Sequence, residues 1–274
     1  MELLKINIGS YLISLILSTI AMPFFLNMLI DSNCAALNYK KEEIPISLGI
    51  LFIIVQTMTV SLFSIIKEHH VSVIMAYLVG FILIGFVGIF DDIVGDTTIK
   101  GFKGHISAFF KGRLTTGGLK AGVGFLAALI FSALVSHNVL DLLVNILLIA
   151  LFINFINLFD LRPGRASKVF ILLSIILFGT NDKTHYFDFI IFSFYGILTR
   201  YLPVDIKAKA MMGDVGSNSL GLTLGIYCVL SHGLKIKIIY LIVLIMLQIL
   251  AEKISFSEVI ENNKILKYID NIGR

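Results

Sequence analysis

The chain has 274 residues, of which 57% are hydrophobic and only 15% are charged. A soluble domain contains about 25% charged residues, so the composition excludes an ordinary soluble protein and predicts a membrane protein. The formal net charge of +4 says little by itself. The two cysteines, Cys34 and Cys228, form neither a CxxC pair nor a metal-ligand cluster, so they predict no disulfide and no zinc site.

Several apolar segments approach or exceed the about 20 residues that a helix needs to cross a bilayer. The segments are 5–30, 44–66, 71–90, 118–136, 139–159, 168–180, 186–200, 217–232 and 236–251. The sixth and seventh are short for a full span and are expected to be thin, tilted or partly re-entrant. We predict an all-α, polytopic integral membrane protein with about nine transmembrane helices.

The basic residues are divided unevenly between the connections of these nine segments. Of the 22 Lys and Arg residues, 17 lie in the odd-numbered connections and the carboxyl-terminal stretch, and 5 lie elsewhere. Cytoplasmic loops of membrane proteins carry the excess of Lys and Arg. The amino terminus is therefore predicted outside and the carboxyl terminus in the cytoplasm. Each polar motif described below then falls on the cytoplasmic side.

The longest polar interval follows the third apolar segment and begins with Asp91 and Asp92. Two adjacent carboxylates at the end of a membrane helix need a cation, a proton or bound water to offset their repulsion. Basic residues follow that suit a phosphate-rich ligand: Lys100, Lys103, Lys111, Arg113 and Lys120. The alternative is a solvated loop whose cations only reflect membrane topology.

The second polar motif lies at the end of the fifth apolar segment. Asn154, Asn157 and Asp160 are spaced by three, so they lie near one face of a helix end and could converge on one ligand. Arg162 and Arg165 flank a Pro-Gly breaker, and arginine suits bidentate contact with phosphate. The alternative is a capped helix terminus with two topogenic arginines.

The third motif, Gly213-Asp214-Val-Gly216-Ser217, precedes the eighth apolar segment. Its glycines allow close approach of a ligand, and the beginning helix offers free N–H groups to an anion. Asp214 could bind a hard cation or could cap the helix. Carboxylates from three loops on one membrane face, surrounded by Arg and Lys, fit Mg²⁺-assisted phosphoryl transfer.

Three motifs together resemble those of a known family: Asp91-Asp92, Asn154-x-x-Asn157-x-x-Asp160 and Gly213-Asp214-x-Gly216-Ser217. The family is that of the polyprenyl-phosphate N-acetylhexosamine-1-phosphate transferases, of the glycosyltransferase family 4 type, which serve cell-envelope glycan synthesis. The resemblance covers about residues 40–220. Lys120 occupies the place of the family's loop lysine.

The resemblance implies transfer of a sugar 1-phosphate from a UDP-amino sugar to an undecaprenyl-phosphate-like lipid, with Mg²⁺ as cofactor. The implied catalytic residues are Asp91, Asp92, Asp160 and Lys120. The substrate-binding candidates are Asn154, Asn157, Arg162, Arg165, Gly213 and Ser217. The implied Mg²⁺ ligand is Asp214. One carboxylate of the Asp91-Asp92 pair is the candidate base.

The chain departs from the family at two places. Asp160 is followed by Leu-Arg-Pro-Gly-Arg, where the family usually has a glycine-rich continuation. The family's histidine-rich motif of a late cytoplasmic loop is also missing, because the six histidines lie elsewhere. We therefore expect a subgroup with altered sugar or nucleotide specificity.

The expected organisation is one transmembrane transferase domain, residues 1–251, with cytoplasmic loops 91–120, 154–168 and 201–217. Residues 252–274 form a cytoplasmic tail that begins with a capping box, Ser255-x-x-Glu258. The tail suits an amphipathic helix on the inner membrane surface or, alternatively, a loosely ordered end.

Two other functions stay open. One is a catalytically silent homologue that acts as a membrane scaffold or regulator. The other is a transporter, which should place its carboxylates near the bilayer midplane rather than at the cytoplasmic edge. The expected location is the cell membrane, with a cytoplasmic active site, no nucleic-acid partner, and a homodimer left open.

Overall fold

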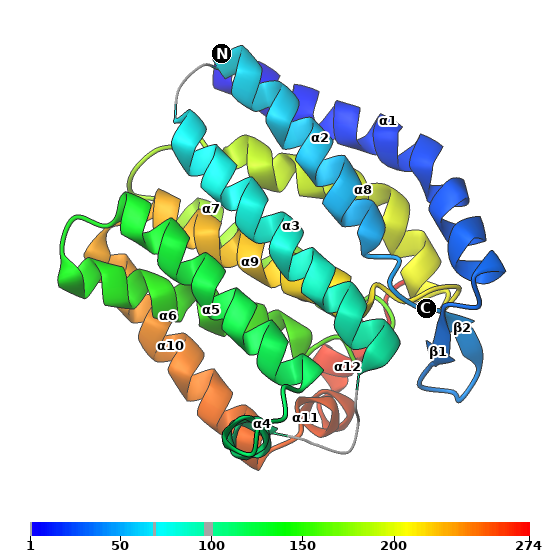
Figure 1. Ribbon diagram of the computed structural model, residues 1–274. Coiled ribbons are helices and arrows are strands. Elements are labelled where there is room, and N and C mark those ends of the chain that lie inside the picture. The colour runs from blue at the N-terminus through cyan, green and yellow to red at the C-terminus, as the bar shows by residue number, and fades with distance from the viewer. Residues whose placement is uncertain (1, 68–69, 96–100) are drawn as a thin grey trace.

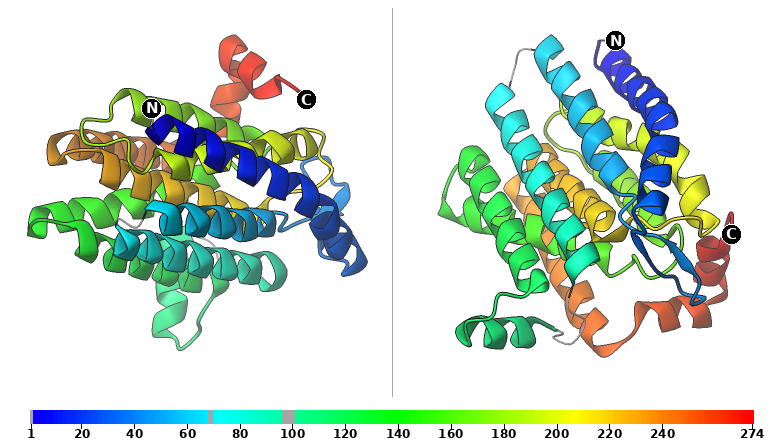
Figure 2. Two further views of the ribbon diagram at one scale, coloured as in Figure 1. Left: turned by 90° about the horizontal axis from the view of Figure 1, so that it is seen from above. Right: turned by 45° about the vertical axis from the view of Figure 1, so that its right-hand side comes forward.

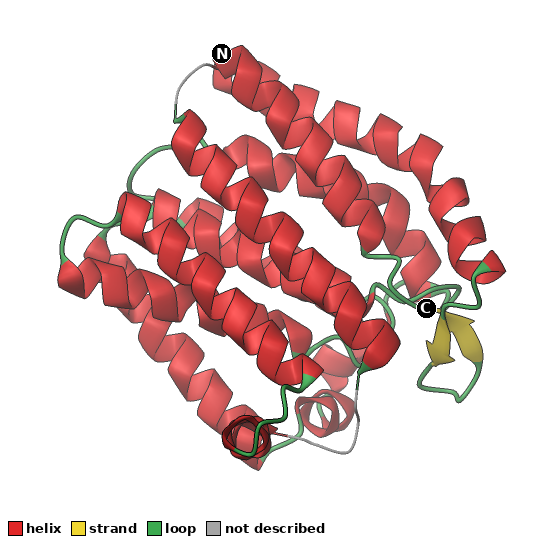
Figure 3. Cartoon of the chain, viewed as in Figure 1, coloured by secondary structure: helices red, strands yellow, loops and turns green. Residues whose placement is uncertain are grey.

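A computed structural model describes residues 2–67, 70–95 and 101–274 (Figure 1). The elements in chain order are α1 (Glu2–Asp31), β1 (Ala35–Leu37), β2 (Glu43–Pro45), α2 (Ile50–Lys67), α3 (Val71–Val94), α4 (Gly101–Phe110), α5 (Thr116–Val135), α6 (Val139–Asn157), α7 (Arg165–Gly179), α8 (Asp188–Ile206), α9 (Gly213–Ser231), α10 (Leu234–Lys253), α11 (Phe256–Asn262) and α12 (Lys264–Asn271). The protein is a bundle of helices with one small pair of strands in the part of the chain that the structure describes (Figure 3).

Each of the nine apolar segments corresponds to a helix. Among the described residues, six helices are long and apolar enough to cross a membrane: α1, α3, α5, α6, α8 and α10. The apolar part of α2 is slightly shorter, and α7 has only 15 residues. The fold is therefore an all-α, multi-pass membrane architecture, while the count of nine spans and their orientation stay predictions.

Two expected boundaries were wrong. The second apolar segment does not begin as a helix at residue 44, because the chain there forms β2 and the helix starts only at Ile50. The seventh segment is not short, because α8 continues through Pro203 to Ile206 and reaches 19 residues.

Helix α9 runs through the middle of the bundle and packs against α3 and α6 (Figure 1). Nearly all of its residues are buried, including Ser217, Asn218, Ser219 and Thr223. At Gly221 an added Cβ would overlap the Ile153 backbone of α6, so only glycine allows the two helices to approach this closely.

The polar motifs meet at one end of the bundle. The carboxyl ends of α3 and α6 lie there together with the amino ends of α5 and α9 and with the β1–β2 hairpin (Figures 1 and 2). Backbone hydrogen bonds join the segment before α2 to the segment before α9, from Met211 N to Pro45 O at 2.8 Å and from Gly49 N to Met212 O at 3.0 Å. The bundle thus brings residues far apart in the sequence to one site.

Neither the hairpin nor α4 was expected from the sequence. The strands are three residues each and pair antiparallel with Ala36 opposite Ile44. The turn between them is closed by Asn38, whose side chain accepts hydrogen bonds from the backbone N–H groups of Lys40 and Glu42 at 2.8 and 3.0 Å. Such short elements inside polar loops leave no periodic apolar pattern to read.

The carboxyl-terminal stretch is ordered as two short helices, α11 and α12. The expected cap is present, because the Ser255 hydroxyl accepts a hydrogen bond from the Glu258 backbone N–H. The two helices stand out from the layer of long helices (Figure 2) and lie at the same end as the polar motifs. Their association with a membrane surface stays a prediction.

Candidate active site

Three helix ends contribute the centre of the site. Asp91 lies in the last turns of α3, Lys120 lies near the start of α5, and Asp214 is the second residue of α9. The Lys120 Nζ donates to Asp91 Oδ2 at 2.8 Å and also to Asp214 Oδ2. Thr115 caps α5 and so fixes the helix that carries Lys120, by accepting a hydrogen bond from Gly118 N at 3.1 Å. One ammonium group therefore bridges two carboxylates from distant parts of the chain.

Asp92 points to a different set of partners. Its Oδ2 accepts a hydrogen bond from Ser47 Oγ at 2.7 Å, and its Oδ1 accepts one from the backbone N of Asp214 at 2.8 Å. Gly213 has a φ of +67° and approaches the Asp92 carboxylate so closely that a side chain there would overlap it. Asp92 thus ties the start of α9 to α3 and to the segment before α2.

The second motif contributes through Asn157 and Asp160. Asn157, the last residue of α6, accepts a hydrogen bond from Ser217 Oγ at 2.9 Å. Asp160 lies in residues 158–164, here called the Asp160 turn. Burial, and then the charges of the neighbouring carboxylates, raise the pKa of Asp160 well above its ordinary value. Asn154 is exposed on α6, away from these contacts.

A polar cavity of about 370 Å³ lies beside this centre. Its walls come from the hairpin, the Asp160 turn and the segment before α9. The charged side chains on these walls are Asp92, Asp160, Arg162, Asp205 and Asp214. A volume of this size lies within the range of small-molecule sites, about 300–1,000 Å³.

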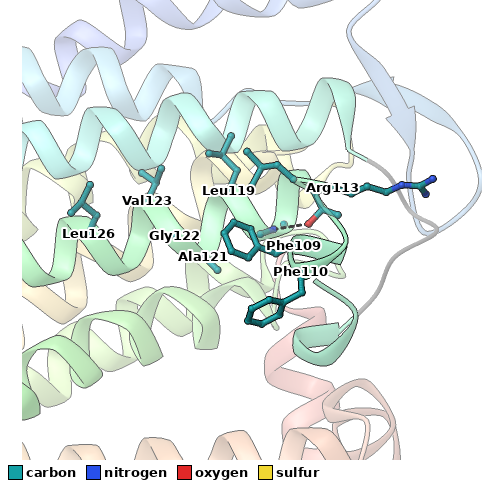
Figure 4. A pocket seen from close by; sticks show the side chains of 12 residues that line it. Phe109, Phe110, Arg113, Leu119, Ala121, Gly122, Val123 and Leu126 are labelled. Carbon is teal, nitrogen blue, oxygen red and sulfur yellow. Dashed lines mark hydrogen bonds between the residues drawn. The ribbon is translucent and has the colours of Figure 1, made fainter. Parts of the chain in front are cut away.

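An apolar cavity of about 460 Å³ lies on the other side, between α4 and the first half of α5. Figure 4 shows Leu119, Val123 and Leu126 along α5, with the rings of Phe109 and Phe110 of α4 near the start of this helix. Leu119 and Ala121, the neighbours of Lys120, both line this cavity. Lys120 itself lines neither cavity, but its partner Asp214 lines the polar one.

The two arginines of the second motif are placed differently. The Arg162 guanidinium carbon lies 4.9 Å from the centre of the Tyr39 ring, and Arg162 lines the polar cavity. Its Nη2 also donates to Glu261 Oε1 at 3.0 Å. Arg165 is almost fully buried and makes a two-point ion pair with Asp270 of α12. The structure therefore brings Arg162 to the cavity and turns Arg165 toward the tail.

Two residues of the site were not among the sequence candidates. Ser47 donates to Asp92, and its signal was a polar residue immediately before an apolar helix. Asp205 lines the polar cavity from the end of α8, and its signal was an acidic residue at the end of an apolar segment. Neither residue could be assigned to the site before the pairing of the segments before α2 and α9 was known.

The fold and site define a multi-pass membrane protein whose helix ends gather carboxylates and a lysine beside a polar cavity, with an apolar cavity along α5. Residues 74–232, more than half of the chain, match the model of glycosyl transferase family 4. The chain belongs to this family, and the resemblance drawn from the three motifs is confirmed. No curated protein matches the chain. Membership supports a transferase that moves a sugar phosphate to a polyprenyl phosphate carrier.

Proposed function

We propose that this protein transfers a sugar 1-phosphate from a UDP-amino sugar to an undecaprenyl-phosphate-like lipid, at the cytoplasmic face of the cell membrane. The observation that carries the proposal is the bridge from Lys120 to Asp91 and Asp214, beside a polar cavity that Asp214 lines and on the helix α5 that lines an apolar cavity. A donor soluble in water and an acceptor soluble in lipid need sites of opposite polarity that share one reacting centre. The two cavities supply such a pair.

The polar cavity is assigned to the donor. Its arginine, Arg162, can pair with a diphosphate oxygen. Asn157 and Ser217 hydrogen-bond to each other and join the end of α6 to the start of α9. The altered turn after Asp160 places the Arg162 cation on the cavity wall, against the Tyr39 ring of the hairpin, which supports an altered donor specificity.

The apolar cavity is assigned to the isoprenoid part of the acceptor lipid. Its phenylalanine and leucine side chains offer no hydrogen bonds, so they suit a hydrocarbon chain. The lipid phosphate would then have to reach Lys120, which lies on the same helix between the lining residues Leu119 and Ala121. An acceptor phosphate oxygen attacks the phosphorus that carries the sugar, a new P–O bond forms, and uridine monophosphate leaves with the electrons of the broken P–O bond.

Asp91 and Asp214 are the residues that would hold Mg²⁺. No group of three or more His, Cys, Asp or Glu side chains in the described parts of the chain could hold a metal ion by itself. Two carboxylates nevertheless fit Mg²⁺, which is typically held by one or two carboxylates together with substrate phosphate oxygens. The ion would neutralise charge on the diphosphate.

Asp92 is assigned to positioning. Both of its carboxylate oxygens accept hydrogen bonds from the protein, so it is occupied with orienting Ser47 and the start of α9. A phosphate monoester has a second pKa of about 6, so the acceptor is largely ionised at neutral pH and needs little help from a base. The role of base is therefore not required of Asp92.

The test is direct. Purified protein is incubated with undecaprenyl phosphate, Mg²⁺ and a panel of labelled nucleotide sugars, and lipid-linked product is measured. Product with one donor, lost after chelation and in an Asp214→Asn variant, supports the proposal. A folded protein that makes no product with any donor would favour the scaffold or regulator instead.

A further inference from the structure

Polar side chains connect α12 to the Asp160 turn. The Arg165 guanidinium, directly after the turn, donates from Nε and Nη2 to the two carboxylate oxygens of Asp270, at 2.9 and 2.8 Å. Arg274 donates from Nε and Nη2 to the carbonyl oxygen of Pro163, at 2.9 and 2.7 Å, and also pairs with Asp270 at 3.0 Å. Burial would raise the pKa of Asp270, but the hydrogen bonds and charges of Arg165 and Arg274 outweigh it and hold this pKa below its ordinary value.

Further contacts reach the same turn. The Phe256 ring at the start of α11 stacks on Phe159, with centroids 5.2 Å apart and planes at 10°. Phe159 directly precedes Asp160. Arg162 reaches Glu261 of α11, and Arg165 also donates to Ser257 Oγ at 2.8 Å. The two tail helices therefore contact the Asp160 turn from its first residues to its last.

Apolar packing does not explain this arrangement. Helix α11 contributes no buried residue, and in α12 only Asp270 is buried. Ile265 and Tyr268 are 71% and 73% exposed. The tail is held by ion pairs, hydrogen bonds and one aromatic stack, which end on the Asp160 turn and on the first residues of α7. An ordinary helix end that only covers apolar surface would show the opposite pattern.

The Asp160 turn carries two side chains of the polar cavity, Asp160 and Arg162. Its first residues are tied to α6 by backbone hydrogen bonds, from Phe159 N to Ile156 O at 3.0 Å and from Asp160 N to Asn157 O at 3.2 Å. At its other end the Gly164 backbone N–H donates to the Asp205 carboxylate. The tail adds contacts at this second end, because Arg274 donates to the Pro163 carbonyl and Asp270 holds Arg165, which directly follows the turn.

We propose that α11 and α12 form part of the donor site by clamping the Asp160 turn against the polar cavity, with Arg165 and Asp270 as positioning residues. The proposal rests on the proposed function for its catalytic consequence, but the clamp itself is a property of the fold. Arg165 acts through Asp270 and does not touch the donor. The tail then sets where Asp160 and Arg162 stand in the cavity.

The experiment uses the full chain with Asp270→Asn, and with Lys267→Gln as the matched control. Lys267 lies in the same helix, carries a charge and is exposed. Hydrogen exchange followed by mass spectrometry is measured on the peptide 158–165 and on the peptide that contains residues 207–214. We expect faster exchange in 158–165 for Asp270→Asn, with residues 207–214 unchanged and the control like the wild type. The donor KM should rise by about tenfold or more, the effect of a lost hydrogen bond to a charged group, with a smaller change in kcat.

A second variant guards against misfolding. Arg274→Gln removes the two hydrogen bonds to Pro163 O from the exposed end of the chain, and it should accelerate exchange in 158–165 in the same direction. Unchanged exchange of this peptide in both variants would overturn the clamp, as would a donor KM that matches the control. If the wild type proves inactive with all donors, the exchange data still decide the clamp, so the two proposals fail separately.

Discussion

Lys120 is the most informative residue to change, because it contacts two carboxylates that come from distant parts of the chain. Its Nζ is 2.8 Å from Asp91 Oδ2 and also contacts Asp214, and the three side chains are 20%, 17% and 23% exposed. At about 4 Å two opposite charges attract by about 4 kcal/mol for an effective dielectric constant of about 20. The cost of desolvating the three charged groups, and their remaining exposure to solvent, offset part of this attraction. We expect Lys120→Gln to lose about 1.5–3 kcal/mol of stability, the range for a hydrogen bond to a charged group.

The catalytic loss should be larger. A cation that meets the transferring phosphate stabilises charge in the transition state, and removal of one such donor costs about 10²–10³ in kcat. The assay is the initial rate of lipid-linked product, beside the melting temperature of each variant. Lys111→Gln is the matched control, because Lys111 lies in the same polar interval and is exposed.

Mg²⁺ provides a signature that a merely structural lysine would not give. Without Lys120, Asp91 and Asp214 lose their positive partner, so Mg²⁺ should raise the melting temperature of Lys120→Gln more than that of the wild type, by linkage. A Lys120→Gln protein as active as Lys111→Gln would refute the phosphate contact. Equal Mg²⁺ shifts in variant and wild type would refute a metal site at these two carboxylates.

Three further predictions follow from the same geometry. Asp214→Asn should abolish Mg²⁺-dependent turnover while the protein still folds, and near-normal turnover would contradict the metal assignment. Because the pKa of Asp160 is raised on folding, its stability contribution is complete below the unfolded pKa of about 4 and is lost as the pH rises through the folded pKa. Asp160→Asn should therefore raise the melting temperature more at pH 8 than at pH 4 and still reduce turnover, and equal shifts at both pH values would exclude this reasoning. Cysteine labelling at Ser107, His137 and the carboxyl terminus should report inside, outside and inside, and external labelling of position 107 would reverse the orientation.

Much of the fold could be predicted from the sequence, because long apolar runs are recognisable as membrane helices. All nine runs became helices, although six reach the length and apolarity of a span among the described residues. The hairpin and α4 could not be read, since three-residue strands and a ten-residue helix in a polar loop carry little periodic signal. The start of the second segment was missed because Ile44 and Pro45 continue the apolar run while their backbone is extended.

The site divides in the same way. Asp91, Lys120 and Asp214 were expected together from their residue types and their places at the ends of apolar segments, and the structure brings them into contact. The destination of Arg165 could not be predicted, because its partner Asp270 lies 105 positions away in a stretch with no motif. Local sequence patterns indicate what a side chain can bind, but they do not identify the distant residue that contacts it in the fold.

The composition of α9 bears on how the protein reaches its membrane. Glycine, serine, asparagine and threonine occupy much of this central helix, and it is not among the six that qualify as spans by length and apolarity. During synthesis such a segment gains little free energy by entering the bilayer as a single helix, because insertion is favoured by residues such as leucine, isoleucine and phenylalanine. Helices α3 and α6, which are made earlier, offer the surfaces that it packs against. Asp214 is therefore delivered to Asp91 and Lys120 late in biogenesis, so a half-made chain holds these charges apart.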